Sequence, residues 1–227
     1  MNNLYAFGCS NTRGDALDDI WDYDKKHTIP QDDDYYPSKY AWPQLLADKL
    51  NLNCFNYGIS GASNKQIWYE LVNAHIKKND TVIVQWTFID RYYVIDYNRL
   101  STNNQIGPWR SDIGVLDDNG KRQRDRNNAF YKHFHTNEDV LYDLNLRISH
   151  ADLYAKQQGF KIFHATCDNN GVQLLPFNHA KILKTSIQYI QNETQSCAND
   201  RDKTGGHPGI LAHKVYADRL YNEILSL

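Results

Sequence analysis

The chain has 227 residues, with 25 basic and 27 acidic side chains and a formal net charge of −2. This length suits one large domain, or one domain with an insertion, and leaves little room for two independent domains. The near balance of charge argues against a protein that binds nucleic acid or an anionic membrane through its overall field. No apolar run approaches the roughly 20 residues of a membrane helix, and no basic segment followed by an apolar one opens the sequence. We therefore expect a soluble, cytoplasmic protein.

Strand-like and helix-like segments alternate along the first part of the sequence. Residues 3–9 form an apolar run, as expected of a buried strand, and residues 42–50 begin with Trp-Pro and repeat apolar side chains at helical spacing. A second strand is predicted over 53–58, followed by a helix that begins near residue 63 and is broken at Asn79-Asp80. The apolar positions of that helix are Ile67, Trp68, Leu71, Val72 and Ile76.

The same alternation continues to the end of the chain. Residues 81–86 are a β-branched run typical of a strand that is buried on both faces of a parallel sheet, and residues 160–167 predict a fourth strand. A helix is predicted over 138–157, with Thr136 and Asp139 at the spacing of a capping box. Weaker periodicity favours a helix over 179–191. A clearer pattern predicts a helix over 209–226, with Leu211, Val215, Leu220 and Ile224 on one side.

Strands that alternate with helices predict an α/β domain with a mainly parallel sheet and helices on both faces. We expect a single domain over 1–227, interrupted by residues 14–40 and by a lid or binding region at about 88–135. The second insertion contains Tyr92, Tyr93, Tyr97, Trp109 and Tyr131 together with several Asn and Arg residues. Such side chains suit stacking on sugar rings or binding a carboxylated or otherwise polar substrate, although the core of a small cap would use similar residues.

Chemically useful residues follow the predicted strands, where ligands bind in open parallel sheets. Ser10 stands in the turn after the first strand, and a serine on such a turn is exposed, with its own N–H able to face a developing oxyanion. Gly61 stands after the second strand, where its N–H could approach the same oxygen. His207 lies in a Gly-rich loop before the last helix and is suited to act as the base, since the order of such residues in the sequence is free.

The segments FGCSNT, NYGISGAS and GGHPG resemble the first, second and fifth blocks of the SGNH (GDSL-like) hydrolases. YAWPQLLADKLN resembles the helix between the first two blocks, and about half of the chain is covered in all. The resemblance implies a three-layer α/β/α sandwich of flavodoxin-like type. It also implies Ser10 as the nucleophile, Gly61 as an oxyanion-hole amide and His207 as the general base.

Three positions depart from the family pattern. Cys9 replaces the usual Asp before the serine, and the third block lacks its Asn, so that Thr87, Asn64 or Arg91 would supply the missing oxyanion donor. The Asp three residues before the histidine is replaced by Thr204. Asp202 is the first alternative for orienting His207, Asp200 is the second, and a Ser-His dyad with a backbone carbonyl is the third.

Simpler explanations stand beside these assignments. Ser10 could be only a helix N-cap, Gly58 and Gly61 only turn residues with positive φ, and Cys9 could be the nucleophile, because a helix N-terminus lowers the pKa of a thiol. The cysteines at 9, 54, 167 and 197 have no metal-type spacing, and His133 and His135 have no further ligand spaced to complete a site.

The function expected from the resemblance is ester hydrolysis, most simply O-deacetylation of a carbohydrate or another small acyl ester, without a metal or an organic cofactor. The expected partner is a small-molecule or glycan ester rather than nucleic acid or a membrane. The alternative is a fold that has lost catalysis and serves as a glycan-binding or assembly module.

Overall fold

The computed structural model describes residues 2–22, 27–28, 36–93, 105–106, 125, 128–168, 181–198 and 206–227. Its centre is a four-stranded sheet in the order β4-β1-β5-β8, and every pairing in it is parallel. The strands are β1 (Asn3–Gly8), β4 (Asn53–Gly58), β5 (Thr81–Trp86) and β8 (Lys161–Thr166). Two short antiparallel ribbons lie outside this sheet: β2 (Trp21–Asp22) with β3 (His27–Thr28), and β6 (Tyr92–Tyr93) with β7 (Gln105–Ile106).

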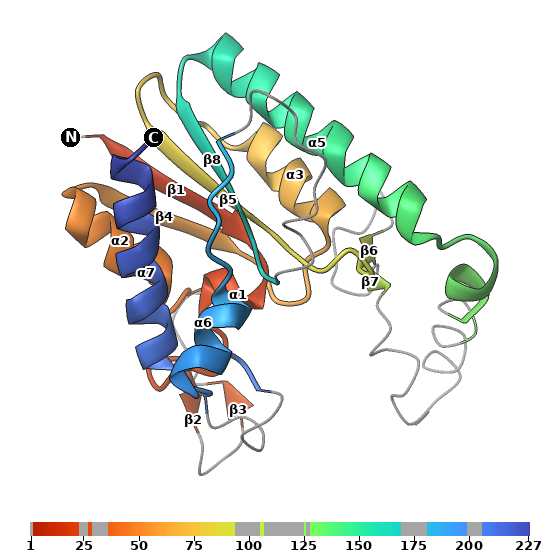
Figure 1. Cartoon of the computed structure of the whole chain (residues 1–227), viewed down its shortest axis with the longest axis horizontal. Coiled ribbons are helices and arrows are strands. Elements are labelled where there is room, and N and C mark those ends of the chain that lie inside the picture. The colour runs from red at the N-terminus through yellow and green to blue at the C-terminus, as the bar shows by residue number, and fades with distance from the viewer. Residues whose placement is uncertain are drawn as a thin grey trace.

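Helices cover both faces of the sheet, which gives the predicted three-layer α/β/α architecture. The helices are α1 (Ser10–Arg13), α2 (Trp42–Leu50), α3 (Asn64–Asn73), α5 (Asn137–Gln158), α6 (Ile187–Thr194) and α7 (Ile210–Leu225), and residues 128–133 are also helical. Helices α3 and α5 lie on one side, and α2 and α7 lie on the other (Figure 1). The protein thus has an α/β fold with a mainly parallel sheet.

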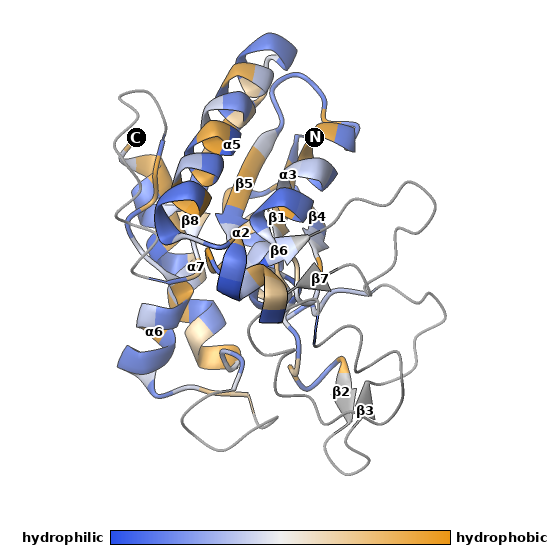
Figure 2. Ribbon diagram, turned by 90° about the vertical axis from the view of Figure 1, so that its right-hand side faces the viewer, coloured by the Kyte–Doolittle hydropathy of each residue, from blue (hydrophilic) through white to orange (hydrophobic). Residues whose placement is uncertain are grey.

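Two apolar clusters hold the layers together. Phe7, Val84 and Trp86 pack toward α3 and α5, whereas Leu4 and Ile83 pack toward α2, α6 and α7. Neighbouring residues of a strand point to opposite faces, so a strand covered on both sides needs a continuous apolar run. Figure 2 shows this hydrophobic colouring along β5. At the edge of the sheet, β4 alternates exposed and partly buried residues instead.

Local sequence signals explain where several helices begin. The Thr136 hydroxyl accepts a hydrogen bond from the Asp139 N–H, which confirms the predicted cap of α5. The Ser63 hydroxyl accepts from the Gln66 N–H and starts α3. However, α3 ends at Asn73, so the prediction that Ile76 belongs to it is wrong. After α3 the chain forms a non-helical connection, in which the Asp80 carboxylate accepts a hydrogen bond from the Lys77 N–H.

Two predictions for the last third of the chain need correction. Residues 181–186 are not helical, because the Leu183 N–H donates to the His164 carbonyl at 2.7 Å and holds this segment against β8. Helix α6 therefore begins after its N-cap, Ser186. The prediction that Leu211 belongs to the apolar side of α7 is wrong, because this residue is 53% exposed. The buried side of α7 consists of Ala212, His213, Tyr216, Ala217 and Leu220.

Most of the two predicted insertions falls outside the described residues, including Tyr97 and Trp109. The single domain with a lid or binding region at about 88–135 therefore stays a prediction. Among the helices that the structure describes, none has the length and apolarity needed to cross a bilayer.

Candidate active site

The carboxyl ends of all four sheet strands lie at one edge, because the sheet is parallel. Helix α1 follows β1 directly and lies at this edge (Figure 1). Helix α7 runs back along the sheet, so its C-terminus is at the same end of the molecule as the N-terminus of the chain and its first turn is at the opposite end. The segments that carry Ser10 and His207 therefore both lie toward the carboxyl edge.

Two glycines allow α1 to pack tightly against the strand ends. A Cβ atom on Gly8 would lie 1.9 Å from the Thr12 hydroxyl oxygen, and one on Gly58 would lie 2.3 Å from the backbone nitrogen of Arg13. Gly58 does not have a positive φ, so the expectation of a left-handed turn is wrong there, whereas Gly61 has a φ of 73°. Gly58 is thus explained by close packing, and Gly61 by a left-handed turn.

A buried hydrogen-bond network connects α1 to β5 and α7. The Thr12 hydroxyl donates to the Gln85 side-chain oxygen at 2.7 Å, and the Gln85 amide donates to the Tyr216 hydroxyl at 3.1 Å. Gln85 and Tyr216 are fully buried, on β5 and α7. The network therefore joins the helix that begins with Ser10 to the helix that follows His207.

Arg13 and Asp15 connect α1 to the loop that contains Gly61. The Ser60 hydroxyl accepts from the Arg13 guanidinium at 3.0 Å and donates to the Asp15 carboxylate at 2.5 Å. Arg13 and Asp15 also form an ion pair at 3.2 Å, with only 17% of each side chain exposed. Since Ser60 directly precedes Gly61, these contacts fix the Gly61 loop beside the Ser10 turn.

The backbone N–H groups of Ser10 and Gly61 are the predicted oxyanion-hole donors. Neither of them is hydrogen-bonded to an acceptor in the part of the chain that the structure describes. The Ser10 side chain itself is 6% exposed, so the prediction of an exposed serine is wrong. Its burial follows from the packing of α1 against β1 and β4.

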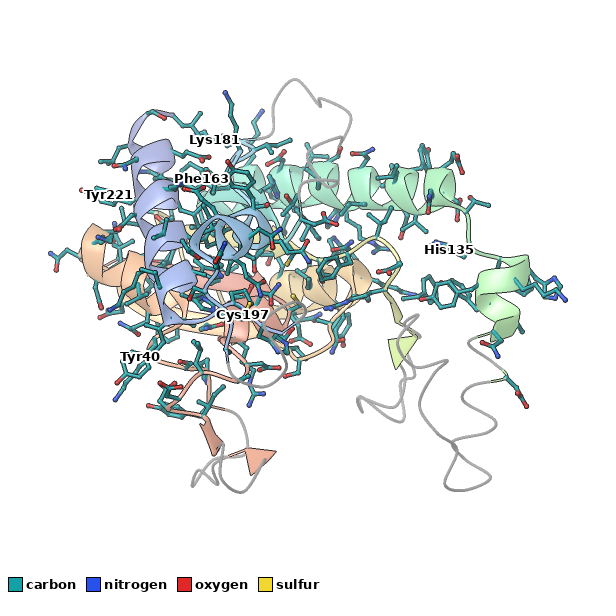
Figure 3. The ribbon with its side chains drawn as sticks, turned by 60° about the horizontal axis from the view of Figure 1, so that its bottom comes forward. Tyr40, His135, Phe163, Lys181, Cys197 and Tyr221 are labelled. Atoms are coloured by element: carbon teal, nitrogen blue, oxygen red, sulfur yellow. The ribbon has the colours of Figure 1, made fainter. Side chains whose placement is uncertain are left out.

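The loop that carries His207 is held by three hydrogen bonds. The Ala198 N–H donates to the His207 carbonyl at 2.7 Å, the Gly209 N–H donates to the Ser196 carbonyl at 2.9 Å, and the Gln191 amide donates to the Gly206 carbonyl at 2.8 Å. Pro208 pairs with Cys197 in an antiparallel bridge, and Cys197 is labelled in Figure 3. His207 is partly exposed. Asp200, Asp202 and Thr204 lie outside the described residues, so the group that orients His207 stays a prediction.

His213 lies one turn into α7 and is fully buried. Its Nδ1 accepts a hydrogen bond from the Trp42 backbone N–H at 3.1 Å, so a neutral ring carries its proton on Nε2. Burial and, to a smaller extent, the charge of His207 lower the pKa of His213, the Pro208 backbone offsets part of this effect, and the resulting pKa is about 3. His213 therefore stays neutral in the folded protein and supports the turn that follows His207.

The low pKa of His213 predicts acid sensitivity. A histidine in an unfolded chain has a pKa of about 6.5. Below that pH the unfolded chain binds a proton at His213, whereas the folded protein does not. The unfolding free energy is therefore unaffected by His213 titration above pH 6.5, and it decreases as the pH falls from 6.5 toward 3. We expect the unfolding free energy to fall by about 1.4 kcal/mol more per pH unit between pH 6 and pH 4 than it does in His213→Asn. Urea titrations of both proteins measure this difference, and equal slopes would contradict it.

Asn64 and Thr87 join the second and third strand ends. The Thr87 N–H donates to the Asn64 side-chain oxygen at 2.8 Å, and the Asn64 amide donates to the Thr87 carbonyl at 3.1 Å. Both residues are buried, at 5% and 4% exposure. These two hydrogen bonds use one of the two amide N–H groups of Asn64 and do not involve the Thr87 hydroxyl. The assignment of Asn64 or Thr87 as an oxyanion donor stays a prediction.

Two buried thiols, Cys9 after β1 and Cys167 after β8, also lie at the carboxyl ends of the strands. The sulfur atoms of Cys9 and Cys167 are 3.5 Å apart, and both residues are fully buried. The hydrogen bond with Cys167 holds the pKa of Cys9 well below its usual value against the opposing effect of burial, with help from the charge of Arg91. Arg91 therefore lies near the residue that directly precedes Ser10. The Arg91 guanidinium also lies over the Phe88 ring, 4.7 Å from its centre.

Sequence reasoning missed Gln85, Tyr216, Arg13 and Asp15. A signal existed for Gln85, since it is the polar residue in a run otherwise suited to burial on both faces. No comparable signal marked Arg13 or Asp15, because their partner Ser60 is more than 40 residues away.

Among the described residues, no group of three or more metal-binding side chains is present. His135, labelled in Figure 3, lies against the Tyr131 ring instead, with 5.2 Å between the ring centres.

Comparison with protein-family models and with the sequences of curated proteins finds no match. Solved structures do match. The psychrotrophic esterase EstA from Pseudoalteromonas sp., in a structure inhibited by monoethylphosphonate, has a TM-score of 0.52 and 12% identity over 100% of this chain and 98% of its own. The acetyl xylan esterase Est2A from Butyrivibrio proteoclasticus has a TM-score of 0.50 and 13% identity over 99% of this chain and 64% of its own.

A further similar structure is that of a carbohydrate esterase whose active site displays divergent catalytic and non-catalytic binding functions. It has a TM-score of 0.50 and 12% identity over 100% of this chain and 65% of its own. Identities this low establish a common fold rather than a common activity. Together with the parallel sheet, the covering helices and the blocks at the strand ends, these similarities show that the chain has the fold of the SGNH, or GDSL-like, hydrolases.

Proposed function

We propose that the protein is a serine esterase in which Ser10 is the nucleophile and His207 the general base. The observation that carries this proposal is the pair of backbone N–H groups, of Ser10 and Gly61, that no acceptor in the described residues occupies. The loops that bear them are held together through Ser60. Two peptide N–H groups beside a serine suit the negative oxygen that forms when a hydroxyl attacks an ester carbonyl.

The reaction follows from these roles. Ser10 Oγ attacks the carbonyl carbon while His207 removes its proton, and the protonated imidazole then gives that proton to the leaving alkoxide. His207 then removes a proton from water, the water oxygen attacks the acyl-serine carbonyl, and the imidazolium returns the proton to Ser10 Oγ as the C–O bond breaks and the acid is released. The N–H groups of Ser10 and Gly61 stabilise the oxyanion, and each such donor contributes about 3 kcal/mol to the transition state. Thr87, Asn64 and Arg91 are the candidates for a third donor in place of the missing Asn.

The acid partner of His207 is assigned to Asp202 first, with Asp200 and a dyad as the alternatives. The substrate class is a small-molecule or glycan ester, and O-deacetylation of a carbohydrate is the specific form that we propose. The names of two structurally similar proteins, an acetyl xylan esterase and a carbohydrate esterase, support this choice.

A second function is favoured by the 6% exposure of Ser10 and by the absence of the third-block Asn. A buried serine without a full set of oxyanion donors would suit a module that binds glycans or other partners without cleaving them. The two functions differ in one property, which is the reactivity of Ser10.

A fluorophosphonate probe measures that reactivity directly. We expect the wild-type protein to gain one phosphonyl group, carried by the peptide that contains Ser10, because the oxyanion donors stabilise the similar charge of the phosphonylation transition state. Ser10→Ala should remain unlabelled, and the exposed Ser226→Ala should label like the wild type. Folded wild-type protein that shows no labelling would favour the binding module.

A further inference from the structure

A pocket of about 830 Å³ opens between α3, the β5–β6 connection, the helical segment 128–133 and the first half of α5. Its walls include Asn64, Lys65, Arg91, Tyr92, Phe130 and Arg147. A volume of this size is typical of sites for drug-sized ligands. An acetyl group, roughly two to three times the volume of a water molecule, would leave most of the pocket empty.

Two residues in the wall of the pocket, Asn64 and Arg91, are also candidates for the third oxyanion donor. Asn64 lies three residues after Gly61, and its side chain holds the backbone of Thr87 at the end of β5. Arg91 lines the pocket and is close enough to Cys9 to lower the pKa of its thiol. The pocket therefore shares two wall residues with the proposed active site.

Aromatic and aliphatic side chains form much of the wall. The rings of Tyr92 and Phe130 lie 4.6 Å apart at an angle of 32°. Phe134, Tyr142 and Leu146, which also line the pocket, remain 73%, 64% and 50% exposed. Large apolar side chains that stay exposed around one concave surface favour an apolar ligand, and flat ring faces favour a planar one.

The charges in the pocket favour an anion. The cations that line the pocket are Lys65, Arg91 and Arg147, and the carboxylates that line it are those of Asp139 and Asp143. The carboxylate of Asp90 also interacts with Arg91. Arg147 already binds Asp143 with contacts of 2.6 and 2.8 Å. Lys65 has no ion pair among the described residues, and its ammonium group lies 5.6 Å from the centre of the Tyr92 ring. Lys65 is also in the first turn of α3, where the helix dipole favours negative charge.

The electrostatics of Lys65 agree with this geometry. Burial lowers the pKa of its ammonium, and the positive charge of Arg147 lowers it further, while Asp143 offsets part of the effect. A partly buried cation that faces another cation is relieved by an anionic ligand.

We propose that this pocket binds a planar aromatic group that carries a negative charge, of the class of aromatic carboxylates. This inference deepens the proposed function, because the pocket would then hold an aromatic carboxylate carried on the alcohol portion of the ester that Ser10 cleaves. Its ring would lie against Tyr92 and Phe130, and its carboxylate would face Lys65.

Two isosteric probes separate the ring from the charge. The fluorescence of 2-naphthoate, an anion, and of 2-naphthamide, which is neutral, reports binding to the full chain without any turnover. We expect the wild type and Ser10→Ala to bind naphthoate equally, and more tightly than naphthamide. Lys65→Met should weaken naphthoate binding about tenfold, the loss expected for one charge-assisted contact, and should leave naphthamide unchanged. Phe130→Leu should weaken both probes about fivefold.

Lys156→Met serves as the matched control, since Lys156 is an exposed lysine near the other end of α5. It should bind both probes like the wild type. Equal affinity of the wild type for the two probes, or an unchanged naphthoate affinity in Lys65→Met, would overturn the proposal. Because these titrations involve no turnover and the reactivity of Ser10 is measured separately with the fluorophosphonate, failure of the pocket proposal is distinguishable from failure of the esterase proposal.

Discussion

Replacing His207 with Asn should lower kcat for p-nitrophenyl acetate by about 10⁴-fold or more, because no other group is assigned to remove the Ser10 proton. Ser10→Ala should cause a loss of similar size. Since the two side chains act in one step, the double variant should be hardly less active than either single variant. Steady-state kinetics on the four proteins measure this non-additivity.

His75→Asn is the matched control for this cycle. His75 is exposed and lies in the α3–β5 connection, near the amino-terminal edge of the sheet, so its replacement should leave kcat unchanged. Losses in Ser10→Ala and His207→Asn that multiply in the double variant would mean that the residues act independently. That result would remove the Ser-His pair from the mechanism.

Gly58→Ala should be among the most destabilising single-methyl changes in the protein. Its Cβ would lie 2.3 Å from the Arg13 nitrogen and 2.8 Å from the Arg13 Cα, which are backbone atoms that cannot rotate away. We expect the unfolding free energy to fall by at least about 3 kcal/mol, because α1 must separate from the end of β4. Urea denaturation followed by circular dichroism measures the loss.

Gly61→Ala provides a comparison at the same edge of the sheet. Its φ of 73° makes an alanine strained, at a cost of about 1 to 2 kcal/mol, but its backbone N–H is retained. Gly61→Ala should therefore be less destabilised than Gly58→Ala. Equal stability of the two variants, or a Gly58→Ala variant as stable as the wild type, would contradict the close packing of α1 against the end of β4.

The sheet could be predicted from the sequence because its signals are local. The β-branched run at 81–86 and the run that ends at Gly8 need burial on both faces, and each became a strand with nearly the predicted bounds. The start of α6 could not be predicted, because residues 181–186 are held by a long-range pairing with β8. The periodicity was misleading at Leu211, because the first turn of α7 buries Ala212 and His213 instead.

The site was predictable only in part for the same reason. The turn at Ser10 and the loop at Gly61 are marked by local glycines, and both follow strands of the sheet. The contacts that fix them, from Arg13 to Ser60 and from Thr12 to Gln85, join residues 47 and 73 positions apart, and no local pattern reveals such pairs. The pocket that Asn64 lines was not predicted, although Tyr92, one of the aromatic residues singled out in the 88–135 region, lies in its wall.

The central claim is that the hydroxyl of Ser10 is chemically activated, and the site of phosphonylation tests it most directly. Peptide mapping of the wild-type protein after treatment with a fluorophosphonate should place one adduct on Ser10 and none on the neighbouring Cys9. An adduct on Cys9 or at a distant residue, or no adduct on protein that hydrolyses p-nitrophenyl acetate, would contradict it.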